Sequence, residues 1–194
     1  MTPGTRSLST ADARRDAVID SAVHVFARSG LSGTTVADVA DHAGISPAYV
    51  FKLFSGKTPL FVAALEHCYA RILDVLEAAA SRSPDATPAD VLDRLGAAYA
   101  DLIADRDVLM LQVHAQAAVD DPAIAETVRA GIARITDLAA ARSRAGDTEV
   151  QRFMAYGQLC HLLTAVDAFT IDEPWATTLT AAIRHTEPTP PHPH

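Results

Sequence analysis

The chain of 194 residues lacks the marks of disulfide-rich, β-rich and membrane-spanning proteins. Its 2 cysteines, Cys68 and Cys160, lie far apart within apolar helical patterns, which excludes a disulfide framework and a CxxC metal pair. There is no asparagine, and most of the 9 glycines and 11 prolines fall at segment ends or in the tails, which disfavours a turn-rich β fold. No stretch approaches the roughly 18 apolar residues of a membrane span, and residues 1–10 have no signal-peptide pattern. We therefore expect a helical, cytoplasmic protein without membrane segments.

The net charge of −8 is unevenly distributed. Residues 1–60 carry six basic and five acidic side chains, a net charge of +1, which leaves −9 for the rest of the chain. A near-neutral segment with local cationic groups can approach the phosphates of DNA, whereas an acidic remainder is repelled by them. The asymmetry permits nucleic-acid binding without requiring it, because acidic surfaces also keep proteins soluble.

Apolar residues recur at helical spacing along most of the chain. The pattern predicts an all-α protein of about nine helices, over residues 12–29, 36–43, 47–54, 58–80, 88–106, 107–119, 122–144, 148–171 and 174–184. The segment 107–119 is apolar enough to be buried. The segment 148–171 is apolar on more than one side, so we expect a partner subunit against it. Residues 187–194 are rich in His and Pro and are expected to be disordered.

Local signals between residues 35 and 54 predict a helix, a tight turn and a second helix. Thr35 and Asp38 have the spacing of a capping box at the start of the first helix. Gly44 can take the left-handed conformation that ends it. Ser46 then caps the next helix, with Pro47 in its first turn, where no amide partner is needed.

A helix-turn-helix reads DNA because its second helix fits the major groove, about 12 Å wide, and presents side chains to base edges. On the outward face of residues 47–53, Ala48 can contact a thymine methyl, Tyr49 a phosphate or base, and Lys52 a phosphate. Hydroxyl and ammonium groups at the starts of neighbouring helices can hold further phosphates. The predicted DNA-contacting residues are Thr34, Thr35, Ser46, Pro47, Ala48, Tyr49, Lys52 and Lys57.

Over residues 14 to 62 the sequence resembles the tetracycline-repressor (TetR) family of bacterial regulators. The string that carries the resemblance is Phe26-Ala27-x-x-Gly30, Thr34-Thr35-Val36-x-Asp38-Val39-Ala40-x-x-Ala43-Gly44-Ile45-Ser46-Pro47 and Phe54-x-x-Lys57-x-x-Leu60. The resemblance implies a DNA-binding domain in residues 1–57 and an effector-binding, dimerising domain in residues 58–186. It further implies a homodimer joined through its last two long helices, a near-palindromic operator in double-stranded DNA, and repression relieved by a small, largely apolar ligand.

Two positions depart from the family pattern. Where the family usually has Tyr and then His shortly before the second Phe, this chain has Phe51 and Leu53. Two expected phosphate contacts are therefore missing. Three interpretations are open: Tyr49 replaces one of them, DNA binding is weaker, or Phe51 and Leu53 simply pack.

The ligand site is expected between the helices of the second domain. A mostly apolar cavity with a few polar groups is typical of small-molecule sites. The candidate lining residues are Tyr99, Met110, His114, Phe153, Gln158 and His161. A lone histidine on an apolar face is more often a hydrogen-bonded core residue than a ligand contact. A metal site from His114, Cys160 and His161 is disfavoured because adjacent residues point differently around a helix.

No pattern in the sequence favours an enzyme, a metal or a cofactor. Ser55-Gly56-Lys57-Thr58 imitates the end of a phosphate-binding loop, but that loop needs a glycine where Phe51 stands and a preceding strand. No Gly-x-Ser-x-Gly elbow occurs. Two alternatives remain: a small-molecule-binding helical protein with weakened DNA binding, and an enzyme.

Overall fold

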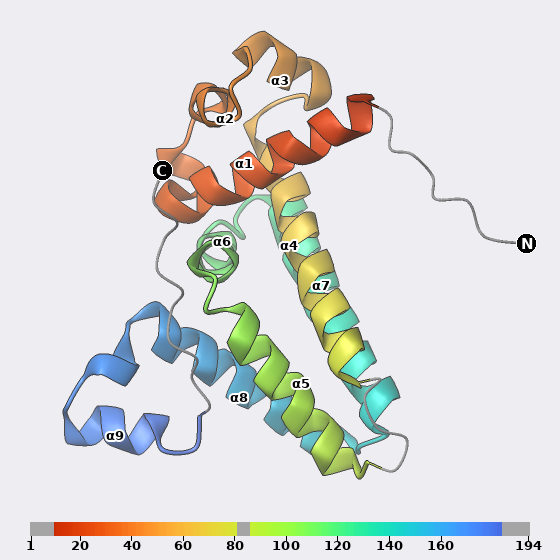
Figure 1. Cartoon of the computed structure of the whole chain (residues 1–194), viewed down its shortest axis with the longest axis vertical. Coiled ribbons are helices and arrows are strands. Elements are labelled where there is room, and N and C mark those ends of the chain that lie inside the picture. The colour runs from red at the N-terminus through yellow and green to blue at the C-terminus, as the bar shows by residue number, and fades with distance from the viewer. Residues whose placement is uncertain (1–9, 81–85, 184–194) are drawn as a thin grey trace, which may run out of the picture.

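The computed structural model describes residues 10–80 and 86–183, and within these ranges the secondary structure is entirely helical (Figure 1). This confirms the predicted all-α class. The elements of the described ranges are α1 (Thr10–Gly33), α2 (Val36–His42), α3 (Pro47–Leu53), α4 (Lys57–Ala80), α5 (Pro88–Leu102), α6 (Arg106–Ala117), α7 (Pro122–Ser143), α8 (Asp147–Ala165), the 3-10 helix η1 (Ala168–Thr170) and α9 (Pro174–Thr180).

Helix α1 is packed against elements on both sides of it. Val18, Ala22 and Phe26, four residues apart, are all buried and form one apolar face. The ring of Phe26 meets that of Phe61 in α4 edge-on, with centroids 4.9 Å apart. At Gly30 the backbone leaves the helical region with a φ of 67°, and one further turn follows. The helix therefore bends where the sequence predicted that it would stop.

Helix α2 begins and ends as its local sequence predicts. The Thr35 amide donates to Asp38 Oδ2 at 2.7 Å, and the Asp38 amide donates to Thr35 Oγ1 at 3.2 Å. At the other end Gly44 has a φ of 66°. The Ile45 amide then donates to the carbonyl of Ala40 at 2.9 Å, which is the hydrogen bond between residues five positions apart that defines a Schellman motif. These bonds set the turn between α2 and α3.

Helix α3 also has the predicted start. Ser46 Oγ accepts from the Tyr49 amide at 3.3 Å, and Pro47 occupies the first helical turn. Because α3 has only seven residues, it is too short to be stable alone. Its stability therefore depends on the burial of Val50 and Phe54, which are 1% and 5% exposed.

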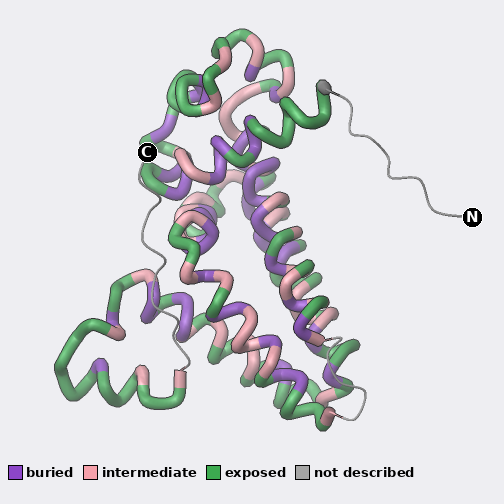
Figure 2. The backbone as a smooth tube through the Cα atoms, in the orientation of Figure 1, coloured by how far each residue is buried: buried purple, intermediate pink, exposed green. Residues whose placement is uncertain are grey.

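The long helix α4 descends from the α1–α3 unit and packs along α7, while α5 leads up to α6, which lies beneath α1 (Figure 1). One continuous apolar cluster connects α1 to α8, and buried residues line the inward faces of these helices (Figure 2). No helix in the described ranges is long and apolar enough to cross a membrane.

Several helix ends differ from their predicted positions. Helix α5 stops at Leu102 because Asp105 caps a new helix, its side chain accepting from the Asp107 amide at 3.1 Å. Helix α7 is ended by Arg144, which adopts a left-handed φ of 56°, ahead of the predicted Gly146. Helix α8 ends at Ala165, and Asp167, with a φ of 52°, leads into η1. The predicted last helix of residues 174–184 ends at Thr180.

The C-terminal elements leave large apolar side chains exposed. Helix α9 contacts η1 and projects from the rest of the described chain (Figure 1). Trp175 on α9 is 49% exposed, and Leu162 on α8 is 58% exposed. The exposed large apolar residues of this region are Tyr156, Leu162, Val166, Ile171, Trp175 and Leu179.

The contact between α4 and α7 depends on the absence of a side chain at Gly131. A Cβ there would lie 2.5 Å from Cε1 and Cε2 of the buried Tyr69 ring. We expect Gly131→Ala to lower the free energy of unfolding by up to about 2 kcal/mol, because overpacking costs about 1–3 kcal/mol and the better helix propensity of alanine offsets about 1 kcal/mol of it. Urea denaturation followed by circular dichroism measures the change.

The matched control is Gly96→Ala in α5, where an added Cβ would meet nothing within 4 Å. Here alanine should raise the free energy of unfolding by up to about 1 kcal/mol, since only helix propensity changes. If both variants were equally stabilised, Tyr69 would not restrain the distance between α4 and α7.

Candidate functional site

The outward face of α3 is the most strongly predicted site in the chain. Val50 and Phe54 point into the core, whereas Ser46, Pro47, Ala48 and Lys52 are exposed and Tyr49 is half-buried. Helix α3 lies at one extremity of the molecule, with α2 beside it (Figures 1 and 2). A capped helix held at the surface with one side free has the geometry needed to enter a DNA groove.

Phe51 is part of this exposed face. Its side chain is 54% exposed, so the alternative in which both Phe51 and Leu53 simply pack does not hold for Phe51. It holds for Leu53, which is half-buried and packs against the core. The difference follows from helix geometry, because residues 48, 51 and 52 lie on one side of α3 and residues 50, 53 and 54 on the other. Phe51 thus stands beside Ala48 and Lys52 as an apolar group facing solvent.

The two threonines before α2 have opposite environments. Thr34 is 1% exposed, and its Oγ1 is buried without a hydrogen-bond partner among the described residues, so it is not accessible to a phosphate. Thr35 is exposed, and its hydroxyl is used in the capping box. The backbone and side-chain hydrogen bonds from Thr35 lower the pKa of Asp38, which stays ionised at the positive end of α2. Lys57, the first residue of α4, is half-buried.

A cation from α1 supports α3 and was not predicted from the sequence. The guanidinium of Arg15 lies 4.8 Å from the centre of the Phe54 ring, at the end of α3. Such a contact stabilises by about 0.5–1 kcal/mol at an exposed position. The two residues are 39 positions apart, and only the packing of α1 on α3 brings them together. Arg15 therefore adds positive charge at the C-terminal end of α3.

A groove of about 670 Å³ lies between α5 and α8 in the second half of the chain. Aromatic side chains and two glycines, Gly96 and Gly157, line it, and an added Cβ on either glycine would meet nothing within 4 Å. Most of its lining is apolar or aromatic, with Asp93, Glu149 and Arg152 as the charged members; the other lining residues are Ala89, Leu92, Gly96, Ala97, Tyr99, Ala100, Phe153, Tyr156, Gly157, Cys160, Ala182 and Ile183. A groove of this size and composition suits a small, largely apolar molecule.

Of the six residues predicted to bind a ligand, the structure brings Tyr99 and Phe153 together in this groove. The Tyr99 hydroxyl donates to Gln112 Oε1 at 3.3 Å, and burial raises the pKa of Tyr99. Gln158 is exposed and does not line the groove. Met110 lines a different cavity, between α6 and α1.

The two predicted histidines each have a packing role. His161 is buried, and its Nε2 donates to the Leu109 carbonyl at 3.2 Å. Burial lowers the pKa of His161, so its ring is neutral at pH 7. His114 packs against Gly30 in α1, where an added Cβ would lie 2.8 Å from Nδ1. Sequence spacing could not distinguish these packing positions from cavity positions, because both lie on the inner faces of their helices.

The described residues hold no group of three or more His, Cys, Asp or Glu side chains placed to bind a metal ion. Burial raises the pKa of Cys68 to about 12 and also raises that of Cys160. Both thiols are therefore protonated at neutral pH, the form that is a poor nucleophile.

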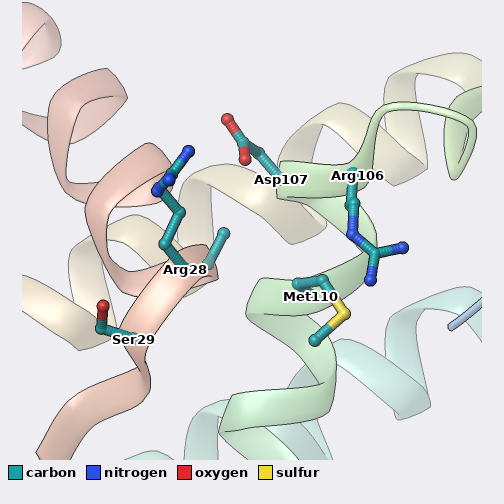
Figure 3. Close-up of a pocket in the computed structure, with 6 residues that line it drawn as sticks. Arg28, Ser29, Arg106, Asp107 and Met110 are labelled. Atoms are coloured by element: carbon teal, nitrogen blue, oxygen red, sulfur yellow. The ribbon is translucent and has the colours of Figure 1, made fainter. Parts of the chain in front are cut away.

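The cavity between α1 and α6 has about 450 Å³ of space and is lined by charged residues from both helices (Figure 3). Beside it, His24 Nδ1 lies 2.7 Å from Asp107 Oδ2, joining α1 to α6. The ring of His24 also stacks on that of His42 in α2, with centroids 4.6 Å apart. Contacts thus run from α6 through α1 to α2.

The sequence similarity to known proteins is concentrated in the N-terminal part of the chain, which contains α1–α3. Residues 18–64 match the family described as bacterial regulatory proteins, tetR family. Over 70 residues the chain is 36% identical to the HTH-type transcriptional regulator BetI of Brucella anthropi, a match that spans 36% of each protein. The similarity to this curated relative therefore covers about a third of its length.

The fold as a whole resembles solved structures of regulators. A TetR-like transcriptional regulator from Rhodococcus sp. RHA1 superposes with a TM-score of 0.66 over 90% of this chain and 95% of its own, at 21% identity. The transcriptional regulator FadR from Bacillus subtilis, solved with stearoyl-CoA, gives 0.67 over 86% and 94%, at 12% identity. Residues 18–64, from α1 into α4, thus match the tetR family of bacterial regulatory proteins, and the chain as a whole shares the fold of these solved regulators.

Proposed function

We propose that this chain is a homodimeric, sequence-specific DNA-binding regulator, a repressor that a small, largely apolar ligand releases from its operator. The observation that carries the proposal is the outward face of α3, where Ala48, Phe51 and Lys52 are exposed on a helix held by Val50 and Phe54. Residues 1–57 act as the DNA-binding domain and residues 58–186 as the effector-binding and dimerising domain. Residues 187–194, expected to be disordered, lie outside the described residues.

The DNA contacts divide into base contacts and phosphate contacts. Ala48, Tyr49 and Phe51 face the base edges, while Lys52, Lys57 and the start of α2 at Thr35 hold the phosphates. Ser46 and Pro47 fix the start of α3. Thr34 is left out of this set because it is buried. The acidic remainder of the chain, repelled by phosphate, keeps the α3 end directed at the duplex.

The dimer uses the exposed apolar residues of the C-terminal elements. Leu162, Val166 and Trp175 are each about half exposed, which is costly for large apolar side chains unless a partner covers them. A two-fold pairing through this surface buries the same residues of both copies. It presents two α3 helices to successive turns of the major groove, about 34–36 Å apart. The operator is then a near-palindrome.

The ligand occupies the groove between α5 and α8, against Tyr99 and Phe153. FadR from Bacillus subtilis, which shares the fold, was solved with stearoyl-CoA, a ligand with a long apolar chain. This supports an apolar ligand for the helical body of the present chain. A ligand that changes the orientation of α5 relative to α8 also moves α6, and the contact of α6 with α1 then moves the α1–α3 unit.

Lys57→Ala should weaken binding to every duplex and reduce the slope of log Kd against log salt concentration by about 1, because one phosphate contact is lost. Fluorescence anisotropy over a salt series measures both quantities. Arg134→Ala, at an exposed position of α7, also removes one positive charge, but from the proposed effector-binding domain, and is the matched control. An unchanged slope for Lys57→Ala would remove Lys57 from the interface.

Phe51 should contact the methyl group of a thymine. On a duplex that the chain binds specifically, replacing that thymine by uracil should weaken binding by about fourfold, since burying one methyl group contributes about 0.8 kcal/mol. In the Phe51→Ala variant the same replacement should have no effect. Fluorescence anisotropy measures the Kd of each combination. If the replacement of thymine by uracil weakened binding equally in the parent and in Phe51→Ala, Phe51 would not contact the methyl group.

Gly157→Leu should fill the groove between α5 and α8 without altering α3. Nile red, a neutral apolar dye, should fluoresce in the presence of the parent chain and much less with the variant, while both bind DNA equally. Ala130→Leu, on the exposed side of α7, adds the same side chain elsewhere. Equal dye fluorescence in all three chains would exclude the groove as the apolar site.

A further inference from the structure

The cavity between α1 and α6 is separate from the groove that the proposed effector occupies. Ala27, Arg28 and Ser29 line it from α1, and Arg106, Asp107 and Met110 line it from α6. The close-up shows that the α1 side chains and the α6 side chains border the same space from two helices (Figure 3). Its volume of about 450 Å³ falls in the range of small-molecule sites. Any molecule bound there touches both proposed domains.

The two arginines are weakly neutralised. Within residues 10–80 and 86–183 Arg28 makes no hydrogen bond or ion pair. Arg106 Nη1 lies 3.7 Å from Asp167 Oδ1, and both side chains are more than half exposed, so this pair is weak.

The carboxylate in the lining is already engaged. Asp107 Oδ2 lies 2.7 Å from His24 Nδ1, and within the described ranges Asp107 forms no ion pair with Arg28 or Arg106. Asp105, the N-cap of α6, is bonded to Arg71 at 3.2 Å. The cavity also lies at the first turn of α6, a helix of 12 residues, where the helix dipole is positive.

We propose that this cavity binds a small organic oxyanion, with the phosphate or carboxylate group held between the Arg28 and Arg106 guanidinium groups and its carbon part against Met110 and Ala27. Guanidinium groups suit such anions because their planar donors match two oxygens at once.

Because the cavity lies between the two proposed domains, binding of an anion there should change the affinity for DNA; this step rests on the proposed function. One arginine belongs to the α1–α3 unit and the other to the helical body, so the oxyanion is bound best at one relative position of the two. If DNA also selects one position, the anion and DNA change each other's dissociation constants by the same factor. The site thus regulates DNA affinity independently of the apolar groove.

Calorimetric titration of the full chain with inorganic pyrophosphate, and separately with citrate, tests the site. Sodium chloride keeps the ionic strength constant. We expect saturable binding of at least one probe, weakened about tenfold by Arg28→Gln and by Arg106→Gln, because each removes a charged hydrogen-bonding partner. Arg129→Gln, at an exposed position of α7, should bind as the parent does. Thermal unfolding of each variant verifies that the fold is retained.

Binding of pyrophosphate alone assigns the site to phosphates, and binding of citrate alone to carboxylates. No saturable binding of either probe, or binding unchanged by both arginine substitutions, overturns the proposal. The same probe should alter the anisotropy-measured Kd for DNA in the parent and leave it unchanged in Arg106→Gln; an equal change in both contradicts the coupling. A chain that binds the probe but no DNA at all would refute the proposed function and leave the anion site standing.

Discussion

The burial of Val50 and Phe54 is the interaction on which the candidate function depends. A helix of seven residues cannot persist in water by its own hydrogen bonds, so α3 exists because these two side chains are held in the core. The same anchoring fixes its rotation. With Val50 and Phe54 inside, Ala48, Phe51 and Lys52 must face outward. The Arg15 guanidinium, 4.8 Å from the centre of the Phe54 ring, adds a contact from α1 at the end of α3.

Helix α1 links this small unit to the rest of the molecule. It meets α4 through Phe26 and Phe61, and α6 through the His24–Asp107 pair and the contact of Gly30 with His114. Gly30 permits the close approach because it has no side chain and adopts a positive φ. The cavity between α1 and α6 lies at this contact. In the proposed mechanism a movement of α6 reaches α3 through α1, and ligand in the groove between α5 and α8 acts through the same contact.

Features set by neighbouring residues could be predicted from the sequence. The capping box at Thr35, the left-handed Gly44 and the Ser46–Pro47 start all occur as expected, because each depends on residues within one turn. Positions of helix ends were less predictable. Arg144 has the left-handed conformation expected of a glycine, and α5 ends at Leu102 although its helix was predicted to continue to Arg106.

Features set by tertiary packing could not be predicted. Thr34 and Thr35 are adjacent in sequence, yet one is buried and the other exposed. Tyr99 and Phe153 lie in one groove, whereas His161 bonds to a backbone carbonyl in the core, although all three occupy apolar helical positions. Arg28 and Arg106 come from segments that share no sequence motif. Only the crossing of α1 and α6 brings both arginines to the cavity between these helices.

We propose that α3 recognises DNA sequence as one of a symmetric pair. Selection of bound duplexes from a random DNA library by the full chain, followed by sequencing, tests this proposal. We expect enrichment of an inverted repeat whose half-site centres are about 10–10.5 base pairs apart or a multiple of that spacing. A bound pool with the composition of the starting library, or one enriched in a single unrepeated site, would contradict it.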